Sequence, residues 1–258
     1  MTTALTHSGL MAGRWLRILW RQPWFVAITL VQPVIWLLLF GALFERVVDI
    51  PGFAGDDYVD FLVPGIVVMT ALFSAGWSGM GIINDLDRGV MDRFLVSPAR
   101  RASLVAGPMG QLAAIVIIQS LIIVALGLAR GADLAGGVAG VAVLIGCAIL
   151  LAWAIGGLSM AIALLARKEE TLIGAVNFLV LPLTFLSTAF MPSSLAPGWL
   201  ADVAGYNPVN WAIEAGREAL AADPSWGDVA GWSGLLVGTA LVCGWAAVRA
   251  LRAYQRSV

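Results

Sequence analysis

The sequence predicts an all-α integral membrane protein with six transmembrane helices. Of its 258 residues, 60% are hydrophobic and only 12% are charged, whereas about a quarter of a typical soluble domain is charged. The mean hydropathy is +0.91. A transmembrane helix needs about 20 mostly apolar residues. Six runs meet that requirement: 24–44, 61–83, 106–129, 136–166, 171–191 and 231–248.

The distribution of cations predicts which side of the cell membrane each loop faces. Cytoplasmic loops carry an excess of Lys and Arg. Of the 15 such residues here, only Arg46, Arg130 and Arg217 would lie outside if the N-terminus is cytoplasmic. Both termini are therefore expected in the cytoplasm. One membrane domain is expected over 1–258, with an interfacial helix (1–23), spans one to five (24–191), outer helices (192–230) and the last span (231–248).

The first expected element is an amphipathic helix ahead of span one. Arg14, Arg17 and Arg21 fall on one helical face. The apolar side chains gather on a second face: Met11, Trp15, Ile18 and Leu19. A basic helix flanked by Trp is typical of the membrane interface. The alternative is that these cations only set the topology.

The loop 84–98, between spans two and three, predicts a short amphipathic helix that ends at Pro98. Its apolar residues follow helical spacing: Leu86, Val90, Met91, Phe94 and Leu95. Its charged residues fill the remaining positions: Asp87, Arg88, Asp92 and Arg93. Exposed apolar side chains beside charges suit the groove of a soluble partner. The alternative is a helix that packs under the bundle.

The outer stretch 192–230 predicts two short helices before the last span. Asn207 is a favourable N-cap with Pro208 at the first helical position. Asp223 and Pro224 would end that helix, and a shorter helical piece is expected at 198–203. Such a pair indicates a re-entrant hairpin, which is tolerated where protein or water covers the backbone. The alternative is an ordinary surface loop.

The rare residue types exclude several functions. The single lysine, Lys168, follows Arg167 and precedes Glu169, so the chain has no phosphate-binding P-loop. With His7 as the single histidine, the sequence predicts no catalytic site and no metal site. The net charge of −1 gives no reason to expect that the chain binds nucleic acid. Because the spans contain almost no ionisable residue, a proton- or sodium-coupled carrier is disfavoured, as is an intramembrane hydrolase.

Two spans carry polar and aromatic residues together, which suits an amphipathic or hydrophobic cargo. The candidates on span two are Thr70, Phe73, Ser74 and Trp77, and those on span five are Asn177, Phe178 and Phe185. We expect cargo to pass between two protomers along these spans. The alternative is ordinary helix packing, where small and hydroxyl residues are common. The pairs Gly136/Gly140 and Gly234/Gly238 indicate such packing.

Residues 87–98 read Asp-Arg-Gly-Val-Met-Asp-Arg-Phe-Leu-Val-Ser-Pro. This segment resembles the G-x-M-D-R-F pattern, with its small-residue-Pro ending, of type 2 ABC exporter permeases, the ABC-2 family. The pattern is that of the daunorubicin-resistance-like drug-efflux branch. Asn207-Pro208, opening a helix before the last span, is a second and less specific match. The general architecture is similar over nearly the whole chain.

The resemblance implies a type V exporter fold of six spans per protomer, paired as a homodimer or with a similar permease. It implies an N-terminal connecting helix, and a coupling helix that contacts a separate ATP-binding subunit through Asp87, Arg88, Val90, Met91, Asp92, Arg93 and Phe94. That subunit would bind ATP and Mg²⁺, and this chain would bind no cofactor.

The function implied is ATP-driven export of an amphipathic or hydrophobic cargo, drug or lipid-like, from the cytoplasm or the inner leaflet. In many relatives Gly-Thr follows the charged run, whereas Val90 and Met91 follow Gly89 here. This departure favours the drug-efflux branch and leaves the cargo open. The alternatives are export of a lipid-linked glycan or polysaccharide, an ATP-independent secondary transporter, and a membrane scaffold.

Overall fold

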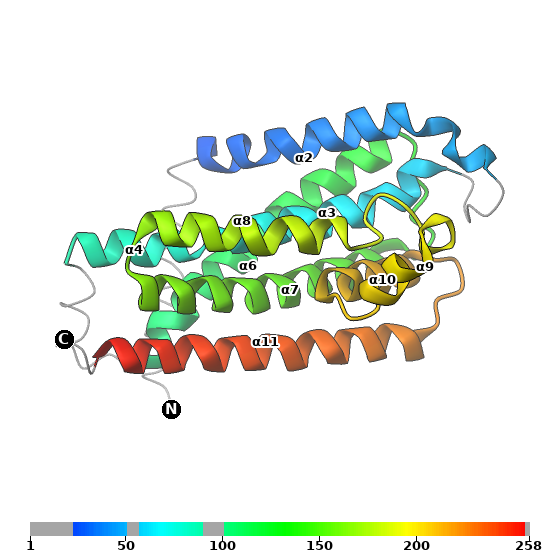
Figure 1. Ribbon diagram of the computed structural model, residues 1–258. Helices are drawn as coiled ribbons and strands as arrows, with labels where there is room; N and C mark the ends of the chain where they lie inside the picture. The colour runs from blue at the N-terminus through cyan, green and yellow to red at the C-terminus, as the bar shows by residue number, and fades with distance from the viewer. Residues whose placement is uncertain (1–22, 51–56, 90–100, 256–258) are drawn as a thin grey trace.

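The computed structural model describes residues 23–50, 57–89 and 101–255, and every regular element within those ranges is a helix. The expected interfacial helix at 1–23 therefore lies almost wholly outside the described residues. The long helices lie alongside one another (Figure 1). The elements are α2 (Pro23–Leu43), η1 (Glu45–Asp49), α3 (Tyr58–Gly76), α4 (Gly79–Asp87), α6 (Arg101–Ala129), α7 (Gly137–Ala166), α8 (Glu169–Phe185), η2 (Ser193–Leu195), α9 (Gly198–Ala204), α10 (Pro208–Leu220) and α11 (Trp226–Gln255).

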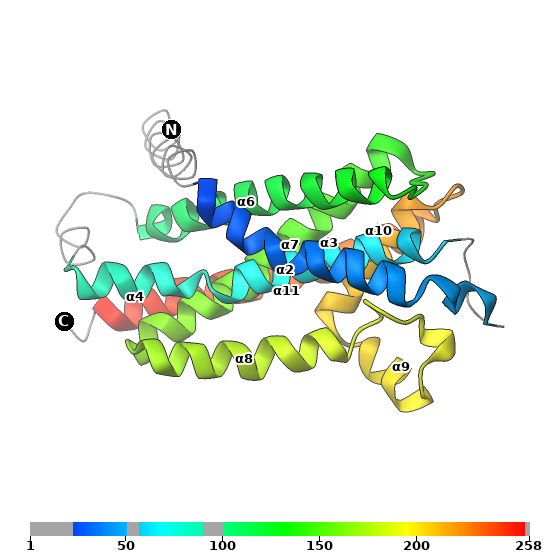
Figure 2. The same cartoon turned by 90° about the horizontal axis from the view of Figure 1, so that it is seen from above.

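The helices α3 and α7 form the centre of the bundle. The residues of α3 from 62 to 72 are all buried, and α7 packs against α3, α6, α10 and α11. Figure 2 shows α6 and α8 on opposite sides of this centre, with α2 lying across α3. The short helices α9 and α10 lie at one end of the bundle, the α10 end, and α4 leads to the other, the α4 end.

Four helical stretches are long and apolar enough to cross a membrane: Tyr58–Asp87, Val105–Ala129, Gly137–Ala166 and Trp226–Tyr254. A multi-pass membrane protein is thus supported, while the count of six spans stays a prediction. The first expected span corresponds to α2, of which the stretch Ile28–Leu43 is apolar but shorter. The fifth was expected over 171–191, but its helix α8 ends at Phe185. The residues after it, although apolar, form an irregular segment.

The second expected span, 61–83, is two helices rather than one. The helix α3 ends at Gly76 and α4 begins at Gly79, with Trp77 and Ser78 between them. The helix expected in the loop 84–98 does not begin as a separate element, because Leu86 and Asp87 belong to the last turn of α4. Gly89 follows with φ of +62°, a left-handed conformation that ends a helix. The remainder of that expected helix, residues 90–98, lies outside the described residues.

Glycines let the central helices approach closely. A Cβ at Gly136 or Gly140 would overlap the main-chain carbonyl of Ala219 in α10, and one at Gly157 would lie 3.1 Å from the carbonyl of Cys243 in α11. The packing role predicted for the first glycine pair is confirmed. The second pair, Gly234 and Gly238, has no neighbour within 4 Å of such a Cβ, so these glycines mediate no close contact within the described part of the chain.

Substitution of Gly140 tests this contact. We expect Gly140→Ala to destabilise the fold by about 1–3 kcal/mol, because the added methyl group meets rigid backbone. The matched control is Gly146→Ala, in the same helix but with open space around its Cβ. Thermal unfolding of both variants in detergent measures the difference. Equal midpoints would show that the α7–α10 contact is not as tight as described.

Candidate functional site

A cavity of about 580 Å³ lies between α2, α3, α4 and α6. Its walls are mostly apolar and include three aromatic side chains and two methionines. Those side chains are Trp36, Met69, Phe73, Trp77 and Met80. The polar residues that line it are Thr29, Gln32, Thr70, Ser74, Ser78, Asn84, Asp85 and Gln111. Asp85 is the only charged residue among the described lining residues, and it lies in α4.

A chain of hydrogen bonds joins three of the helices that enclose the cavity. Ser74 in α3 donates to Oε1 of Gln119 in α6 at 2.9 Å, and Nε2 of Gln119 donates to Oγ1 of Thr29 in α2 at 3.0 Å. Gln119 is almost fully buried. A buried amide is costly unless it is bonded, so this chain fixes α2 and α6 against α3.

The cargo candidates from span two meet in this cavity. Thr70, Phe73, Ser74 and Trp77 all line it. Thr70 donates to the carbonyl of Ile66 in its own helix at 2.7 Å, which is the usual way in which a buried hydroxyl satisfies itself in a helix. The indole of Trp77 remains 40% exposed. The second span thus supplies aromatic surface to the cavity, and one of its aromatic residues, Trp77, lies where the helix of that span is interrupted.

The cargo candidates from span five lie elsewhere. Phe178 and Phe185 are 84% and 62% exposed, and Asn177 is also exposed. All three belong to α8, which lies on the opposite side of the bundle from α6 (Figure 2). They therefore do not line the cavity within one protomer. Their expected place opposite span two, across a boundary between protomers, stays a prediction.

Only the first two of the expected coupling residues fall in the described part of the chain. Asp87 is the last residue of α4 and Arg88 follows as its C-cap, both exposed at the α4 end. The other five, Val90, Met91, Asp92, Arg93 and Phe94, lie outside the described residues. The geometry does establish one link. Because α4 both lines the cavity and ends at Asp87, the expected coupling segment continues directly from a wall of the cavity.

The expected cap of the outer helix is confirmed. Asn207 caps α10 by accepting from the Val209 amide at 2.9 Å, and Pro208 is the first helical residue. The same side chain has a second role, because its Nδ2 donates to the carbonyls of Leu183 and Leu186 at 2.8 Å each. These are carbonyls at the end of α8, where helical partners run out. Asn207 therefore joins the start of α10 to the end of α8.

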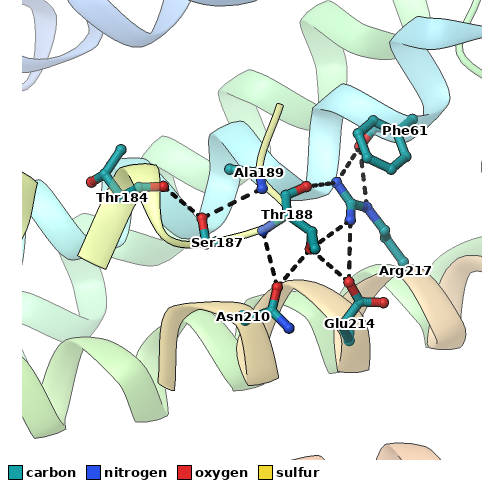
Figure 3. Close-up of polar contacts among 8 residues, drawn as sticks. All are labelled: Phe61, Thr184, Ser187, Thr188, Ala189, Asn210, Glu214 and Arg217. Atoms are coloured by element: carbon teal, nitrogen blue, oxygen red, sulfur yellow. Dashed lines mark hydrogen bonds and ion pairs between the residues drawn. The ribbon is translucent and has the colours of Figure 1, made fainter. Parts of the chain in front are cut away.

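A second polar cluster, which the sequence analysis did not identify, lies beside this cap (Figure 3). Arg217 of α10 donates to the carbonyl of Thr188 at 2.7 Å and to that of Phe61 at 3.2 Å, and its Cζ lies 3.6 Å from the centre of the Phe61 ring. The hydroxyl of Thr188 lies 2.6 Å from both Asn210 Oδ1 and Glu214 Oε1. One signal was available, since Asn210, Glu214 and Arg217 share one helical face.

The electrostatics of this cluster are those of a structural clamp. Burial lowers the pKa of Arg217 to about 10, an effect that the carboxylate of Glu214 partly offsets. Because that pKa is still far above neutral, the guanidinium stays charged and needs its hydrogen-bond acceptors. These are supplied by the irregular segment after α8 and by the first turn of α3. The cluster therefore fixes the α10 end of the molecule.

Comparisons with known proteins agree with this architecture. The family described as ABC-2 type transporter matches residues 8–221. The chain is similar to a transport permease named ycf38 from Cyanophora paradoxa, with 32% identity over 80% of this chain and 71% of that protein. It is 27% identical, over 77% of this chain and 69% of the relative, to the daunorubicin resistance ABC transporter permease DrrB1 of Streptomyces coeruleorubidus. A protein named doxorubicin resistance ABC transporter permease DrrC, from Mycobacterium tuberculosis, is 22% identical over 92% and 84% of the two chains.

Removal of one hydroxyl tests the clamp. We expect Thr188→Val to destabilise the protein by about 1–3 kcal/mol, because it leaves buried polar groups without their partner. Thr239→Val in α11 is the control, since its hydroxyl only bonds the Leu235 carbonyl one turn earlier. Unfolding by denaturant in detergent measures both. A Thr188 variant as stable as the Thr239 variant would mean that the cluster does not hold the outer segment.

Proposed function

This chain belongs to the ABC-2 type transporter family, and from that premise we propose that it is the transmembrane permease of an ATP-driven exporter. The observation that carries the proposal is the cavity between α2, α3, α4 and α6, whose wall of aromatic and apolar side chains meets a few polar groups. Such a surface suits an amphipathic or hydrophobic cargo. The relatives named for daunorubicin and doxorubicin resistance support a drug or drug-like lipid.

The partner of the permease, in this proposal, is a separate subunit that binds ATP and Mg²⁺. It docks on the coupling segment, Asp87 to Phe94, and acts on α4 from the cytoplasm. Two permease copies pair, since isologous pairing is the commonest assembly, and the exposed face of α8 then borders the second copy. Six spans place both termini in the cytoplasm, and the α10 end faces outward.

Two other functions have less support. An ATP-independent carrier needs an ionisable group near the middle of the membrane. Among the described residues that line the cavity, only Asp85 is charged, and it lies two residues before the end of α4. Export of a lipid-linked glycan or polysaccharide remains the alternative within the family. A panel of cargos in the same vesicle assay separates it from drug export.

The test is transport in vesicles that contain the permease, with and without the ATP-binding subunit and ATP. We expect uptake of an amphipathic dye only when all three are present. Trp77→Ala should lower uptake severalfold, because it removes aromatic surface that is 40% exposed in the cavity. The matched control is Trp245→Ala, which removes an indole that is 61% exposed on α11, outside the cavity.

Two results would contradict this proposal. Uptake without ATP or without the ATP-binding subunit would indicate a secondary transporter. Equal uptake by the Trp77 and Trp245 variants would remove the cavity from the cargo path, while leaving the family function in place.

The coupling segment has its own test in Phe94→Ala. Truncation of a buried aromatic anchor at an interface commonly costs about 2 kcal/mol or more, so the variant should bind the ATP-binding subunit at least tenfold more weakly. Membrane insertion and dye binding should remain. Arg93→Ala separates the charge from the anchor, since an exposed ion pair contributes about 1 kcal/mol at most. Copurification of the two subunits measures association, and an unchanged yield for Phe94→Ala would contradict the docking role.

A further inference from the structure

The interruption between α3 and α4 lies within one apolar stretch, Tyr58–Asp87, that is long enough to cross a membrane. There, hydrogen bonds between residues three apart in the sequence replace the regular helical bonds between residues four apart. The amide of Ser78 donates to the carbonyl of Ala75, and that of Met80 to the carbonyl of Trp77, each at 3.1 Å. Irregular backbone inside a membrane requires partners from the protein. The groups freed at this interruption must therefore be bonded by a neighbouring helix.

One side chain of α7 supplies both missing partners. The hydroxyl of Ser159 accepts from the Gly79 amide at 3.1 Å and donates to the Gly76 carbonyl at 2.5 Å. A serine hydroxyl has one proton to donate and lone pairs to accept with, so both of its functions are used here. Ser159 is only 3% exposed. The last residue of α3 and the first residue of α4 are thus joined through a single buried oxygen.

The contact between the interruption and α7 is close enough to exclude any side chain. A Cβ at Gly79 would lie 2.6 Å from the Ser159 carbonyl, and a Cβ at Gly156 would lie 3.2 Å from the hydroxyl of Ser78. The Ser78 hydroxyl itself donates to Ala75 and lies 3.4 Å from the Gly156 carbonyl. The junction where α3 gives way to α4, called the bend below, is therefore fixed by contacts with α7 and not by the two helices alone.

The same interruption divides the wall of the cavity. Phe73 and Ser74 line the cavity from α3, Met80 and Asn84 line it from α4, and Trp77 lies at the junction. The chain continues from α4 into the expected coupling segment. A change in the angle between α3 and α4 would thus move one part of the cavity wall relative to the other.

We propose that Ser159 is a positioning residue that holds the bend between α3 and α4, so that movement of the coupling segment reaches the cavity as a pivot of α4. The inference rests on the proposed function for its link to ATP. The geometric part, that one hydroxyl holds the bend, is independent of it. Ser159 touches neither cargo nor nucleotide in this proposal and acts through the backbone of Gly76 and Gly79.

The experiment compares Ser159→Ala with Ser120→Ala in the complete complex. Ser120 is a matched control because it is buried in α6, 1% exposed, and its hydroxyl has no hydrogen-bond partner among the described residues. Amide hydrogen exchange at Gly79 reports on the bend. We expect Ser159→Ala to raise it about fivefold, the factor that corresponds to the loss of one hydrogen bond worth about 1 kcal/mol. Ser120→Ala should match the wild type.

The second readout is the amount of dye transported per ATP hydrolysed in vesicles. We expect it to fall severalfold in Ser159→Ala, while dye binding without ATP and basal ATP hydrolysis stay near the wild type. A merely structural defect would lower binding and yield as well. Gly79→Ala, which pushes α4 from α7, should reproduce the loss, with Gly238→Ala as the control because its Cβ has open space.

The outcomes separate the two claims. Unchanged exchange at Gly79 in Ser159→Ala would show that the hydroxyl does not hold the bend. Raised exchange with unchanged transport per ATP would show that the bend does not relay movement. Absence of ATP-dependent transport in the wild-type complex would overturn the proposed function and with it the relay, while the exchange measurement would still decide the role of Ser159 in the bend.

Discussion

The constraint on which the described structure depends is that backbone polar groups inside an apolar bundle must be hydrogen-bonded within the protein. Continuous helices satisfy it by themselves. The described chain departs from continuous helix at two important places, the junction of α3 with α4 and the segment after Phe185. At each of them a side chain from another helix completes the bonds, and those few side chains decide where the path of the chain can bend.

The two places are held by different chemistry and with different strength. In the segment after α8, Asn207 bonds the carbonyl of Leu186 and Arg217 bonds that of Thr188. The same two side chains also bond the carbonyl of Leu183 in α8 and that of Phe61 in α3. The junction of α3 and α4 depends largely on the hydroxyl of Ser159. Charge-assisted and multiple bonds are stronger than a neutral pair. The α10 end is therefore held by more and stronger hydrogen bonds than the junction of α3 and α4, which is consistent with the proposed pivot of α4.

The sequence predicted those features that depend on local chemistry. Hydropathy located the long helices, and the Asn207-Pro208 pair located the start of α10 to the residue. It missed the interruption at Trp77 and Ser78 because the run 61–83 is mostly apolar, with no proline or charge at the interruption. The partner that permits it, Ser159, is about 80 residues away and is recognisable only in three dimensions. For the same reason the apolar segment after Phe185 was predicted as helix, and the role of Arg217 was not foreseen.

The candidates on span two were selected because polar and aromatic side chains occur together in an apolar run, and they do line a single cavity. Asn177, Phe178 and Phe185 were selected on the same ground, yet these residues are exposed on α8. Periodicity shows that residues share a face, but not which neighbour covers that face. On α2, Trp36 lines the cavity and also contacts the ring of Phe190 at 5.2 Å between centroids. Trp36 thus connects the wall of the cavity with the segment after α8, while α4 forms the wall at the other end, so a force applied at the α4 end would deform the wall nearest to it first.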